Sequence, residues 1–597
     1  MKCGLEIHQR LDTNKLFCSC PSKLIENEPA DLVIQRRLHP VFSELGEVDK
    51  AAVAEFERDR VYEYSVYNSC NCLVETDEEP PHRTNQEALT IALEIAMHLN
   101  AKPVDEVHVM RKIVIDGSNT SGFQRTAIIA LNGYLETSKG RVGIPQIAIE
   151  EESAGIIEAG DKKMSYRLDR LGIPLVEIST DPDIKEGQHL LEVAEKIGMI
   201  LRATGKVARG LGTIRQDVNV SIEGGARVEI KGAQDLKMLP LLAENEVRRQ
   251  KELISIFNEM KKRLAATAME IRPVTSMDIM DLTHLFSKTS STLISSGIQK
   301  GHHVLGKLFY NKKGLFGKEI QPNRRFGTEL SDYAKTAGVK GIIHSDEDLS
   351  KYKISEEEIN KIKDFLKFQP NDVFVLVVAE PEVAQRALAW VGIRLGPPAV
   401  IEETRRANPD GTSSYMRPLP GKARLYPETD IPSIIIDEKM LKEVKESKGE
   451  SLENKKAKLQ SLLNSEMADK VLRSRHLSLF EKLIELDIEP MLIANTIENT
   501  LVSIRREGFE IASLEETLFE LFTTYKKGEF VKAAIPDILK LMSKGKNLEQ
   551  ALNEGNLRKI SGNELRKIAE EFNYDVAKIM QKYRLRIEPS EIAKLKK

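Results

Sequence analysis

Hydrophobic and polar positions alternate in short runs over the first 265 residues of the chain. Apolar, β-branched runs occur at KIVID (112–116), RVGIPQIAI (141–149), IPLVEIST (173–180) and RVEIKG (227–232). Runs of this length and composition predict strands. Apolar residues at helical spacing predict helices over 85–101, 186–204 and about 240–265. We therefore expect a strand-rich region interrupted by helices.

The pattern restarts after residue 270. A Gly- and Arg-containing segment (314–330) precedes a very apolar run, 372–380, which predicts a strand, and a helical pattern follows it. The Pro- and Gly-rich stretch at 405–433 cannot be a regular helix. Beyond 435 the pattern is helical and charged. The expected fold class is α+β and multidomain, with all-helical C-terminal domains.

Composition narrows the class of protein. A chain of 597 residues predicts about three to five domains. The 88 Lys+Arg and 91 Asp+Glu nearly cancel, which excludes a uniformly basic nucleic-acid coat but allows a local basic patch. No apolar run approaches a membrane span, and Glu6 and His8 lie where a signal peptide needs an apolar core. These features predict a cytoplasmic protein with no membrane partner.

Carboxylates occur at strand positions. Glu6 and His8 are two residues apart, which places both side chains on one face of a strand. Glu177 lies in an apolar strand, where a buried carboxylate is costly without a compensating charge. A run of acids, 150–152, ends another strand. Together these residues could form a Mg²⁺ site, because Mg²⁺ prefers oxygen ligands. Alternatively, Glu177 faces solvent and the acidic run is a solvated turn.

The cysteines form two C-x-C pairs, Cys18 with Cys20 and Cys70 with Cys72. Four thiols could bind a structural Zn²⁺ ion, although the usual spacing is C-x₂₋₄-C. The alternative is four reduced thiols. Cys3 is left over and is expected to be a small buried residue.

Two further segments carry polar groups. The segment 116–126, DGSNTSGFQRT, offers Ser118, Asn119 and Arg125, and Lys112 precedes it, a composition that suits a phosphate-contacting loop. It could equally be a polar turn. In 212–222, alternation places Arg215, Asp217, Asn219 and Ser221 on one strand face, which is natural in a cleft and also at an exposed surface.

Several of these segments together resemble the B/E family of catalytic subunits of tRNA-dependent amidotransferases. The resemblance rests on GLEIHQRLDTNKLFCSCPS, EEESAG, DRLGIPLVEISTDPD, GTIRQDVNVSI, RVEIKG and LYPETDIP, in matching order. The segment 116–126 and an insertion at about 270–400 resemble the archaeal E branch, which acts on glutamyl-tRNA(Gln). The insertion also resembles the extra domain of bacterial-type aspartyl-tRNA synthetases.

The resemblance implies an activity and its residues. Family members use ATP and Mg²⁺ to phosphorylate the Glu side chain of misacylated Glu-tRNA(Gln), and ammonia then displaces phosphate to give Gln-tRNA(Gln). Matching positions imply Mg²⁺ ligands at Glu6, His8, Glu152 and Glu177, with Glu151 as the alternative to Glu152. The implied contacts with ATP or the tRNA 3′ end are Lys112, Ser118, Asn119, Arg125, Arg215, Asp217, Asn219, Glu229 and Lys231.

The resemblance also implies partners and domains. The ammonia is expected from the D subunit of the amidotransferase, an asparaginase-like glutaminase, in an assembly of two D and two E subunits. The implied domains are a cradle catalytic domain (1–268 and 401–438), an inserted aspartyl-tRNA-synthetase-like domain (269–400), a helical domain (439–540) and a tail domain (541–597). The tail has 13 Lys+Arg against 8 Asp+Glu, an excess that suits tRNA phosphates, although a solvated helical face would look the same.

Other functions remain open on the sequence alone. The chain could be a non-catalytic tRNA-binding subunit, although Glu6, His8 and Glu177 speak against that. It could be a variant aspartyl-tRNA synthetase, although class II catalytic motifs are not recognisable. Within the family, it could be the B subunit of the amidotransferase that has three different subunits.

Overall fold

The computed structural model describes residues 1–25, 28–40, 50–56, 59–160, 162–267, 278–419 and 425–595. It divides into two compact units. Unit 1 comprises 1–198 and 206–448, and unit 2 comprises 199–205 and 449–597. The expected boundary at 268/269 lies outside the described residues.

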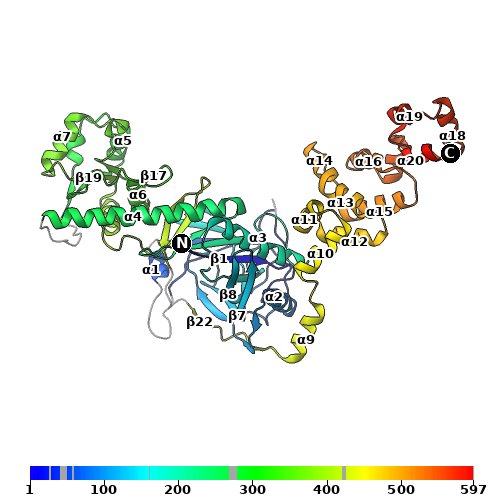
Figure 1. The fold of residues 1–597 in the computed structure, drawn as a ribbon. Helices are drawn as coiled ribbons and strands as arrows, with labels where there is room; N and C mark the ends of the chain where they lie inside the picture. The colour runs from blue at the N-terminus through cyan, green and yellow to red at the C-terminus, as the bar shows by residue number, and fades with distance from the viewer. Residues whose placement is uncertain are drawn as a thin grey trace. The chain divides into compact units, whose positions relative to one another are not determined.

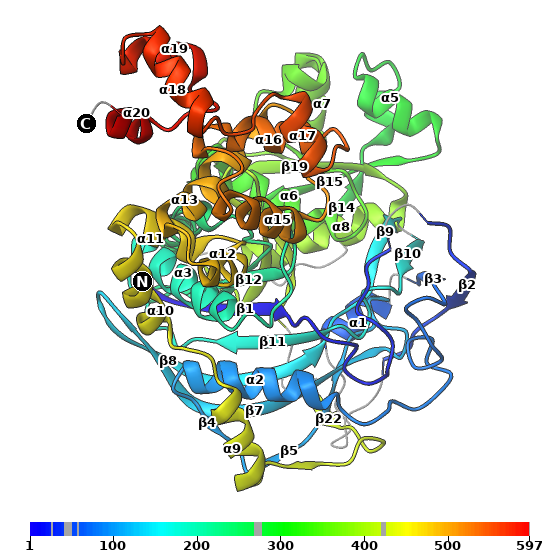
Figure 2. The same cartoon turned by 90° about the vertical axis from the view of Figure 1, so that its right-hand side faces the viewer.

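Unit 1 is built around a large, mainly antiparallel sheet with β1 (Lys2–Arg10) near its middle (Figures 1 and 2). The strand order is β21-β20-β13-β12-β1-β11-β8-β7-β6-β22, and β4 pairs with β7. The bounds are β4 Lys102–Pro103, β6 Met110–Ile113, β7 Phe123–Thr137, β8 Gly140–Glu151, β11 Pro174–Ser179, β12 Ile214–Ser221, β13 Val228–Lys231, β20 Glu403–Ala407, β21 Ser413–Pro418 and β22 Leu425–Pro427.

Three helices of the N-terminal region accompany this sheet. They are α2 (Gln86–His98), α3 (Gly187–Ala203) and the long α4 (Leu239–Thr267). The helix α2 packs on β7 and β8, and α4 packs on β12. Asn85 caps α2, since its side chain accepts a hydrogen bond from the Ala88 amide.

A second sheet, β2-β3-β10-β9, contains the parallel pair β3/β10. Its strands are β2 Leu32–Arg36, β3 Val61–Val66, β9 Gly155–Ala159 and β10 Lys163–Arg167, and α1 spans Lys50–Phe56. The hydroxyls of Tyr62 and Tyr166 donate to the carbonyls of Ile115 and Asp116, which anchors the start of the 116–126 segment. At Gly117, φ is +87° and any Cβ would lie 2.1 Å from the Tyr62 ring, so this turn requires glycine.

The inserted region has its own sheet, β14-β15-β19-β18, and its own core. Its elements are β14 Ile279–Asp281, α5 Thr292–Gln299, β15 His303–Phe309, β16 Glu319–Gln321, β17 Arg324–Arg325, α6 Phe326–Lys335, β18 Ile343–His344, α7 Glu356–Phe365, β19 Val373–Ala379 and α8 Pro381–Leu395. Buried Arg and Glu side chains of α4, α6, α8 and β20 form one ionic cluster, which ties this region to the large sheet.

The short strands β5 (Glu106–Val107) and β23 (Ile434–Ile435) pair with each other, and α9 (Glu438–Ser447) packs on α2 within unit 1. In its described residues after 448, unit 2 is helical, with α10 Leu452–Leu462, α11 Ser465–Arg473, α12 Leu477–Leu483, α13 Pro490–Asn495, α14 Leu501–Arg506, α15 Leu514–Lys526, α16 Ile535–Met542, α17 Leu548–Glu554, α18 Gly562–Glu571, α19 Val576–Tyr583 and α20 Pro589–Leu595. A small separate core holds residues 560–592 together.

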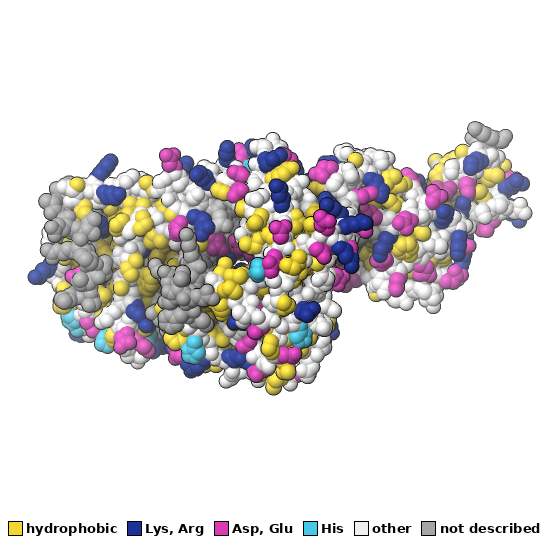
Figure 3. Space-filling view, turned by 90° about the horizontal axis from the view of Figure 1, so that it is seen from below, with side chains coloured by type: hydrophobic (Ala, Val, Ile, Leu, Met, Phe, Trp, Pro, Cys, Tyr) yellow, Lys and Arg dark blue, Asp and Glu magenta, His cyan; other side chains and the backbone are white. Residues whose placement is uncertain are grey.

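The expected strands and helices are confirmed, apart from their ends. The strand expected at 112–116 is β6, which ends at Ile113, since the chain then turns through Gly117. Among the described residues, no helix has the length and apolar character needed to cross a membrane. Lys and Arg side chains are interspersed with Asp and Glu over the face shown in Figure 3, as the near-zero net charge leads one to expect.

Candidate functional site

The site lies on one face of the large sheet, at β1. Leu5 and Ile7 are almost fully buried, and alternation therefore places Glu6, His8 and Arg10 on the opposite face of the strand. The strand register places side chains of the neighbouring strands on the same face of the sheet. His8 lies opposite Glu177 on β11 and Arg215 on β12, and Glu6 lies opposite Asp217.

His8 is the centre of an acidic group. Its Nε2 lies 3.2 Å from Glu150 Oε1 and 3.6 Å from both Glu6 Oε1 and Glu177 Oε2. Donor atoms of Glu6, His8 and Glu177 all lie within 4.8 Å of one another. One cation could therefore bind to all three side chains. We call Glu6, His8, Glu177 and Glu150 the acidic centre. Lys112 borders it, with Nζ 2.8 Å from Glu150 Oε2.

The electrostatics of the acidic centre reflect crowding of carboxylates. Burial, and then the nearby Glu177, raise the pKa of Glu6 to about 7. Burial alone would lower the pKa of His8, but its hydrogen bonds with Glu150 and Glu177 raise it to about 10. Without a metal, a proton on His8 therefore partly offsets the negative charge. A bound divalent cation would also offset the negative charge of these carboxylates. The carboxylate oxygens and the imidazole nitrogen are suitable ligands, so these residues fit such an ion.

A lysine with two acids borders the other side of Glu6. Lys231 Nζ lies 2.6 Å from Asp217 Oδ2 and 2.5 Å from Glu229 Oε1. Burial lowers the pKa of Lys231, but the two carboxylates outweigh burial and raise it. Asn219 follows on the same face of β12, opposite Gly4 and Glu229. The residues expected on one face of β12 do share that face.

Glu152 does not join the acidic centre. Its fully buried carboxylate meets three arginines, Arg10 through Nε and Nη2, Arg170 at 3.3 Å and Arg215 at 3.1 Å. Strand β8 ends at Glu151, and its Glu150 is the carboxylate beside His8. The alternative ligand Glu151 is also elsewhere, where it accepts a hydrogen bond from the Arg125 amide.

The cysteines form a compact group that includes a carboxylate. One donor atom each of Cys18, Cys20, Cys72 and Glu75 lie within 4.8 Å of one another. Zinc with Zn–S bonds of about 2.3 Å needs donors about 3.7 Å apart, which this group can meet. Cys70 is outside the group: it is buried against Ile25 and Tyr67.

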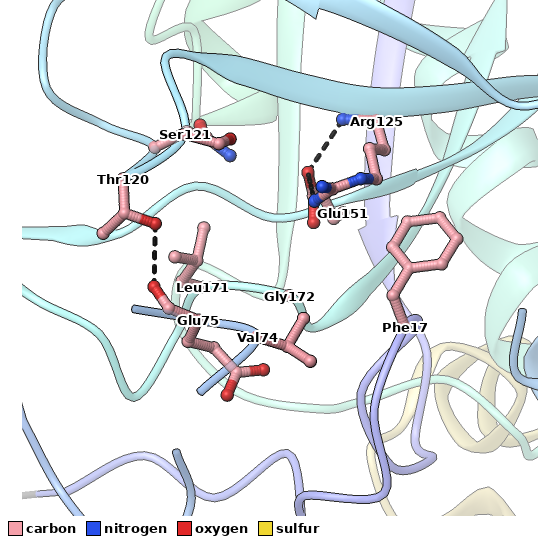
Figure 4. Close-up of a pocket in the computed structure, with 10 residues that line it drawn as sticks. Phe17, Val74, Glu75, Thr120, Ser121, Arg125, Glu151, Leu171 and Gly172 are labelled. Atoms are coloured by element: carbon pink, nitrogen blue, oxygen red, sulfur yellow. Dashed lines mark hydrogen bonds and ion pairs between the residues drawn. The ribbon is translucent and has the colours of Figure 1, made fainter. Parts of the chain in front are cut away.

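The segment 116–126 lies at a separate small cavity. Asn119, Thr120 and Arg125 line it together with Glu75 and Glu151 (Figure 4). The Thr120 hydroxyl donates to the Glu75 carbonyl, and the Ser118 amide donates to Asp116 Oδ1. Arg125 is already paired, because its Nε donates to Glu428 at 2.8 Å and its Nη1 lies 3.5 Å from Glu151. Ser118, Asn119 and Arg125 therefore do not contact the acidic centre.

Three residues that the structure brings into these groups were not singled out from the sequence: Glu75, Arg10 and Arg170. Glu150 was considered with the acidic run, but alternation alone could not show where the strand ends. Glu75 follows Cys72 by three positions, which is the spacing of a C-x₂-C pair of zinc ligands. It was missed because only cysteines were considered as ligands. Arg10 is two residues after His8, so the same alternation predicts that it shares a strand face with Glu6 and His8. Arg170 lies in the turn before β11 and gave no signal, since only the fold brings it to Glu152.

The comparisons with known proteins agree with the motifs. A family model described as the GatB/GatE catalytic domain matches residues 1–442. The chain is 48% identical to the E subunit of glutamyl-tRNA(Gln) amidotransferase from Pyrococcus furiosus over 577 residues, 96% of this chain and 90% of the relative. Identity to the protein of the same name from Methanocaldococcus jannaschii is 47% over 583 residues, 96% and 91% of the two chains. For Methanosarcina acetivorans it is 47% over 553 residues, 91% and 86%.

Proposed function

Because the chain belongs to the GatB/GatE family and is one of the subunits of a glutamyl-tRNA(Gln) amidotransferase, we propose that it carries out both chemical steps of that reaction. In the first, an oxygen of the tRNA-bound Glu side chain attacks the γ-phosphorus of ATP. The bond from that phosphorus to the β,γ-bridging oxygen breaks, and ADP leaves. In the second, ammonia attacks the acyl carbon, the bond to the phosphate oxygen breaks, and a proton is lost.

The acidic centre with its flanking lysines is the observation that carries this proposal. A carboxylate attacking a triphosphate brings negative charges together, which a metal ion and nearby ammonium groups can neutralise. Lys112 lies within 4 Å of both Glu150 and Glu177, and Lys231 borders Glu6 through Asp217. Their Nζ groups could each meet a phosphate oxygen while the carboxylates hold the cation.

We propose that Glu6, His8 and Glu177 hold Mg²⁺, with Glu150 as a further oxygen ligand in the place first assigned to Glu152. Bound Mg²⁺ would neutralise charge on the phosphates. The ATP and tRNA contacts proposed from the family divide by position. The residues on the face that carries the acidic centre are Lys112, Arg215, Asp217, Asn219, Glu229 and Lys231. Asn119 and Arg125 line the small cavity, and Ser118 directly precedes Asn119 in the chain.

We also propose a structural zinc site with ligands Cys18, Cys20, Cys72 and Glu75. Burial, and then the Glu75 charge, raise the pKa of the Cys20 thiol to about 11, so without a metal this thiol stays protonated at neutral pH. Cys18 Sγ donates to Glu75 Oε1 at 2.9 Å in that state. Zinc would replace the thiol protons and couple its binding to pH.

The remaining expectations from the family are proposals of the same kind. They are a glutaminase partner, the D subunit, in a two-plus-two assembly, the tRNA-binding tail at 541–597, and the likeness of the insertion at 269–400 to aspartyl-tRNA synthetases. The proposed domains are those given above. The basic excess of the tail supports tRNA contact. Truncation after residue 540 should weaken tRNA binding and flatten its salt dependence, and an unchanged salt slope would argue against contact.

The test of the function uses ammonium chloride as the nitrogen source, so that no partner is needed. Wild-type chain, γ-labelled ATP, Mg²⁺ and Glu-tRNA(Gln) should give ADP, phosphate and Gln-tRNA(Gln) in equal amounts. Glu6→Gln should abolish product, while Glu136→Gln, a change on an exposed hairpin, should not. ATP turnover that does not depend on Glu-tRNA(Gln), or product formation that survives Glu6→Gln, would contradict the proposal. Binding of Glu-tRNA(Gln) with no turnover would instead favour a non-catalytic tRNA-binding subunit.

A further inference from the structure

The segment that leads into β12 carries an apolar side chain out into solvent. Its residues 209–212 have the sequence RGLG, and we call them the exposed tip. Leu211 has a relative exposure of 105%, so solvent surrounds its side chain. Ile214, the first residue of β12, is also 37% exposed. A Leu in this position forgoes the stabilisation that burial gives an apolar side chain, which calls for an explanation.

The base of the exposed tip is fixed to β1 at both ends. The Ala208 amide donates to the Arg10 carbonyl at 3.0 Å, and the Arg10 amide donates to the Thr213 carbonyl at 2.9 Å. The buried side chain of Gln9 donates through Nε2 to the carbonyls of Ala208 and Thr213, at 3.0 and 3.2 Å. The strand that contributes to the acidic centre therefore also holds the base of the tip.

Two glycines flank the exposed leucine above this fixed base. Gly210 and Gly212 have φ of +120° and +78°, a backbone conformation that favours glycine. Among the described residues, no atom lies within 4 Å of a Cβ placed on either glycine, so close packing does not account for them. The hinges of closing loops are a few residues that absorb large backbone changes. The two glycines fit this role, since they give the tip freedom to move.

The exposed tip lies close enough to the acidic centre to cover it. Leu211 is four residues before Arg215, a separation of at most about 14 Å along the chain. Arg215 lies opposite His8 in the register of β1 and β12. A movement of the tip over this face would bring an apolar side chain to the edge of the acidic centre.

The reaction proposed above has an intermediate that water can destroy. When the oxygen of water attacks the acyl carbon of the acyl phosphate, the bond to the phosphate oxygen breaks and a proton is lost. The products are Glu-tRNA(Gln) and phosphate, so ATP is consumed without amidation. Closing an active site over such an intermediate excludes water and prevents this side reaction. An apolar side chain suits that task, because it does not hold water by hydrogen bonds.

We propose that Leu211 determines which nucleophile attacks the acyl phosphate. The exposed tip closes over the acidic centre when MgATP and Glu-tRNA(Gln) are bound, and Leu211 then excludes water from the acyl carbon. Ammonia enters from a side that the tip does not cover. Leu211 takes no part in making or breaking bonds. This inference rests on the proposed function for the intermediate that is protected.

The test measures ADP and Gln-tRNA(Gln) in one reaction of the full-length chain with MgATP, Glu-tRNA(Gln) and ammonium chloride. Wild type should form the two in equal amounts. Leu211→Ser should hydrolyse the intermediate about 10-fold faster, the effect of a modest change in one barrier, and form excess ADP. Leu211→Met keeps an apolar side chain of similar size and should restore equal amounts. Leu293→Ser, at an exposed position of α5, is the matched control and should behave as wild type.

The source of the excess ADP decides whether water reaches the acyl phosphate. The excess should disappear when Glu-tRNA(Gln) is omitted. In a single turnover in water labelled with heavy oxygen, the label should enter the Glu side chain of the recovered Glu-tRNA(Gln). Excess ADP without Glu-tRNA(Gln), or label in the phosphate alone, would mean that water attacks ATP directly and would overturn the proposal. A wild-type ratio of ADP to product for Leu211→Ser, at every ammonium concentration, would also overturn it.

Closure of the exposed tip is measured separately, by amide hydrogen exchange of the wild-type chain. The amides of residues 209–212 should exchange rapidly in the free chain and more slowly with Glu-tRNA(Gln) and a non-hydrolysable ATP analogue bound. Equal exchange in the two states would show that the tip does not close, and the proposal would fall. If wild type forms no Gln-tRNA(Gln) but the bound ligands still slow this exchange, the proposed function fails and closure of the tip stands.

Discussion

Two groups of charged side chains in unit 1 differ in how completely they are paired and how far they are exposed to solvent. The ionic cluster of α4, α6, α8 and β20 is closed and balanced, with Arg405 paired to both Glu329 and Glu403. The face around β1 is half open, with an excess of acid at His8 and an excess of base at Glu152. The closed cluster satisfies its own charges. The open face is partly exposed, and its acidic group adjoins its basic group without the closed one-to-one pairing of the ionic cluster. This difference is why we propose ligand binding for the open face and a structural role for the closed cluster.

The largest effect should come from breaking the closed cluster. Arg405→Ala removes an ion-pair partner from the buried carboxylates of Glu329 and Glu403. Removal of one member of such a group costs about 3–5 kcal/mol of unfolding free energy. Urea or thermal unfolding measures this cost. Arg406→Ala, at the exposed neighbouring position on β20, should change stability by no more than about 0.5 kcal/mol. Equal effects of the two variants would mean that the cluster does not stabilise the fold.

Glu177→Gln should have the opposite pattern to Arg405→Ala: it should reduce activity and leave the stability of the fold nearly unchanged. It removes one of the crowded carboxylates, so the fold should be as stable as wild type or slightly more stable. Transfer of phosphate to Glu-tRNA(Gln) should fall about 100- to 1,000-fold, since a metal ligand supplies several kcal/mol. Single-turnover transfer from labelled ATP measures the rate, and tRNA affinity should be unchanged. A near wild-type rate with unaltered Mg²⁺ dependence would remove Glu177 from the metal site.

The sequence predicted the open face better than the closed cluster, for a physical reason. Alternation on β1 and β12 placed Glu6 with His8 and Arg215 with Asp217, because a strand fixes which side chains share a face. Nothing local revealed that Arg249 meets Glu329 and Glu403, which are 80 and 154 positions away in the chain. Contacts that depend on how separate elements pack leave no periodic signal.

The same reasoning explains why Glu150, and not Glu152, lies beside His8. The resemblance pointed to the acidic run, but the members of that run differ by single positions. At the end of β8, one position decides whether a carboxylate meets His8, the Arg125 amide or the arginines. The same applies to Cys70 and Glu75, whose positions depend on a turn rather than on a regular element.

A smaller effect is expected at a third group, where Glu428 accepts hydrogen bonds from Arg111 and Arg125. Burial would raise the pKa of Glu428, but the Arg111 and Arg125 contacts outweigh it and lower the pKa from 4.5 to about 2. A lowered folded-state pKa gives stability that is present above pH 4.5 and is lost as the pH falls toward 2.

Glu428→Gln should therefore flatten the acid limb of the stability curve. Wild type should lose about 2 kcal/mol more than the variant between pH 5 and pH 2, while the two curves run parallel above pH 5. Unfolding free energies measured in steps across this range check the difference. Glu136→Gln, at an exposed site, should follow the wild-type curve. Identical acid limbs for Glu428→Gln and wild type would show that this pair of arginines does not hold the carboxylate.

The smallest effect should come from the cysteines, which form another unbalanced group. Three thiolates and Glu75 carry more negative charge than the buried Lys15, 3.5 Å from Glu75, can offset, so the group requires a cation when ionised. Cys18→Ser removes a ligand and should lower zinc content from about one per chain to near zero. Activity should fall about 10-fold, because a lost structural metal loosens the segment that follows β1 without removing the acidic centre.

Cys70→Ser is the matched control for the cysteine group, since Cys70 is also buried but packs against Ile25 and Tyr67 outside the group. It should keep its zinc and lose only a little stability from an added buried hydroxyl. Elemental analysis with thiol titration of the native protein measures both variants. With zinc bound, Cys18, Cys20 and Cys72 should all resist titration. Zinc lost equally in both variants would return Cys70 to the ligand set, and freely titrating thiols without zinc in wild type would leave an ordinary cluster of reduced cysteines.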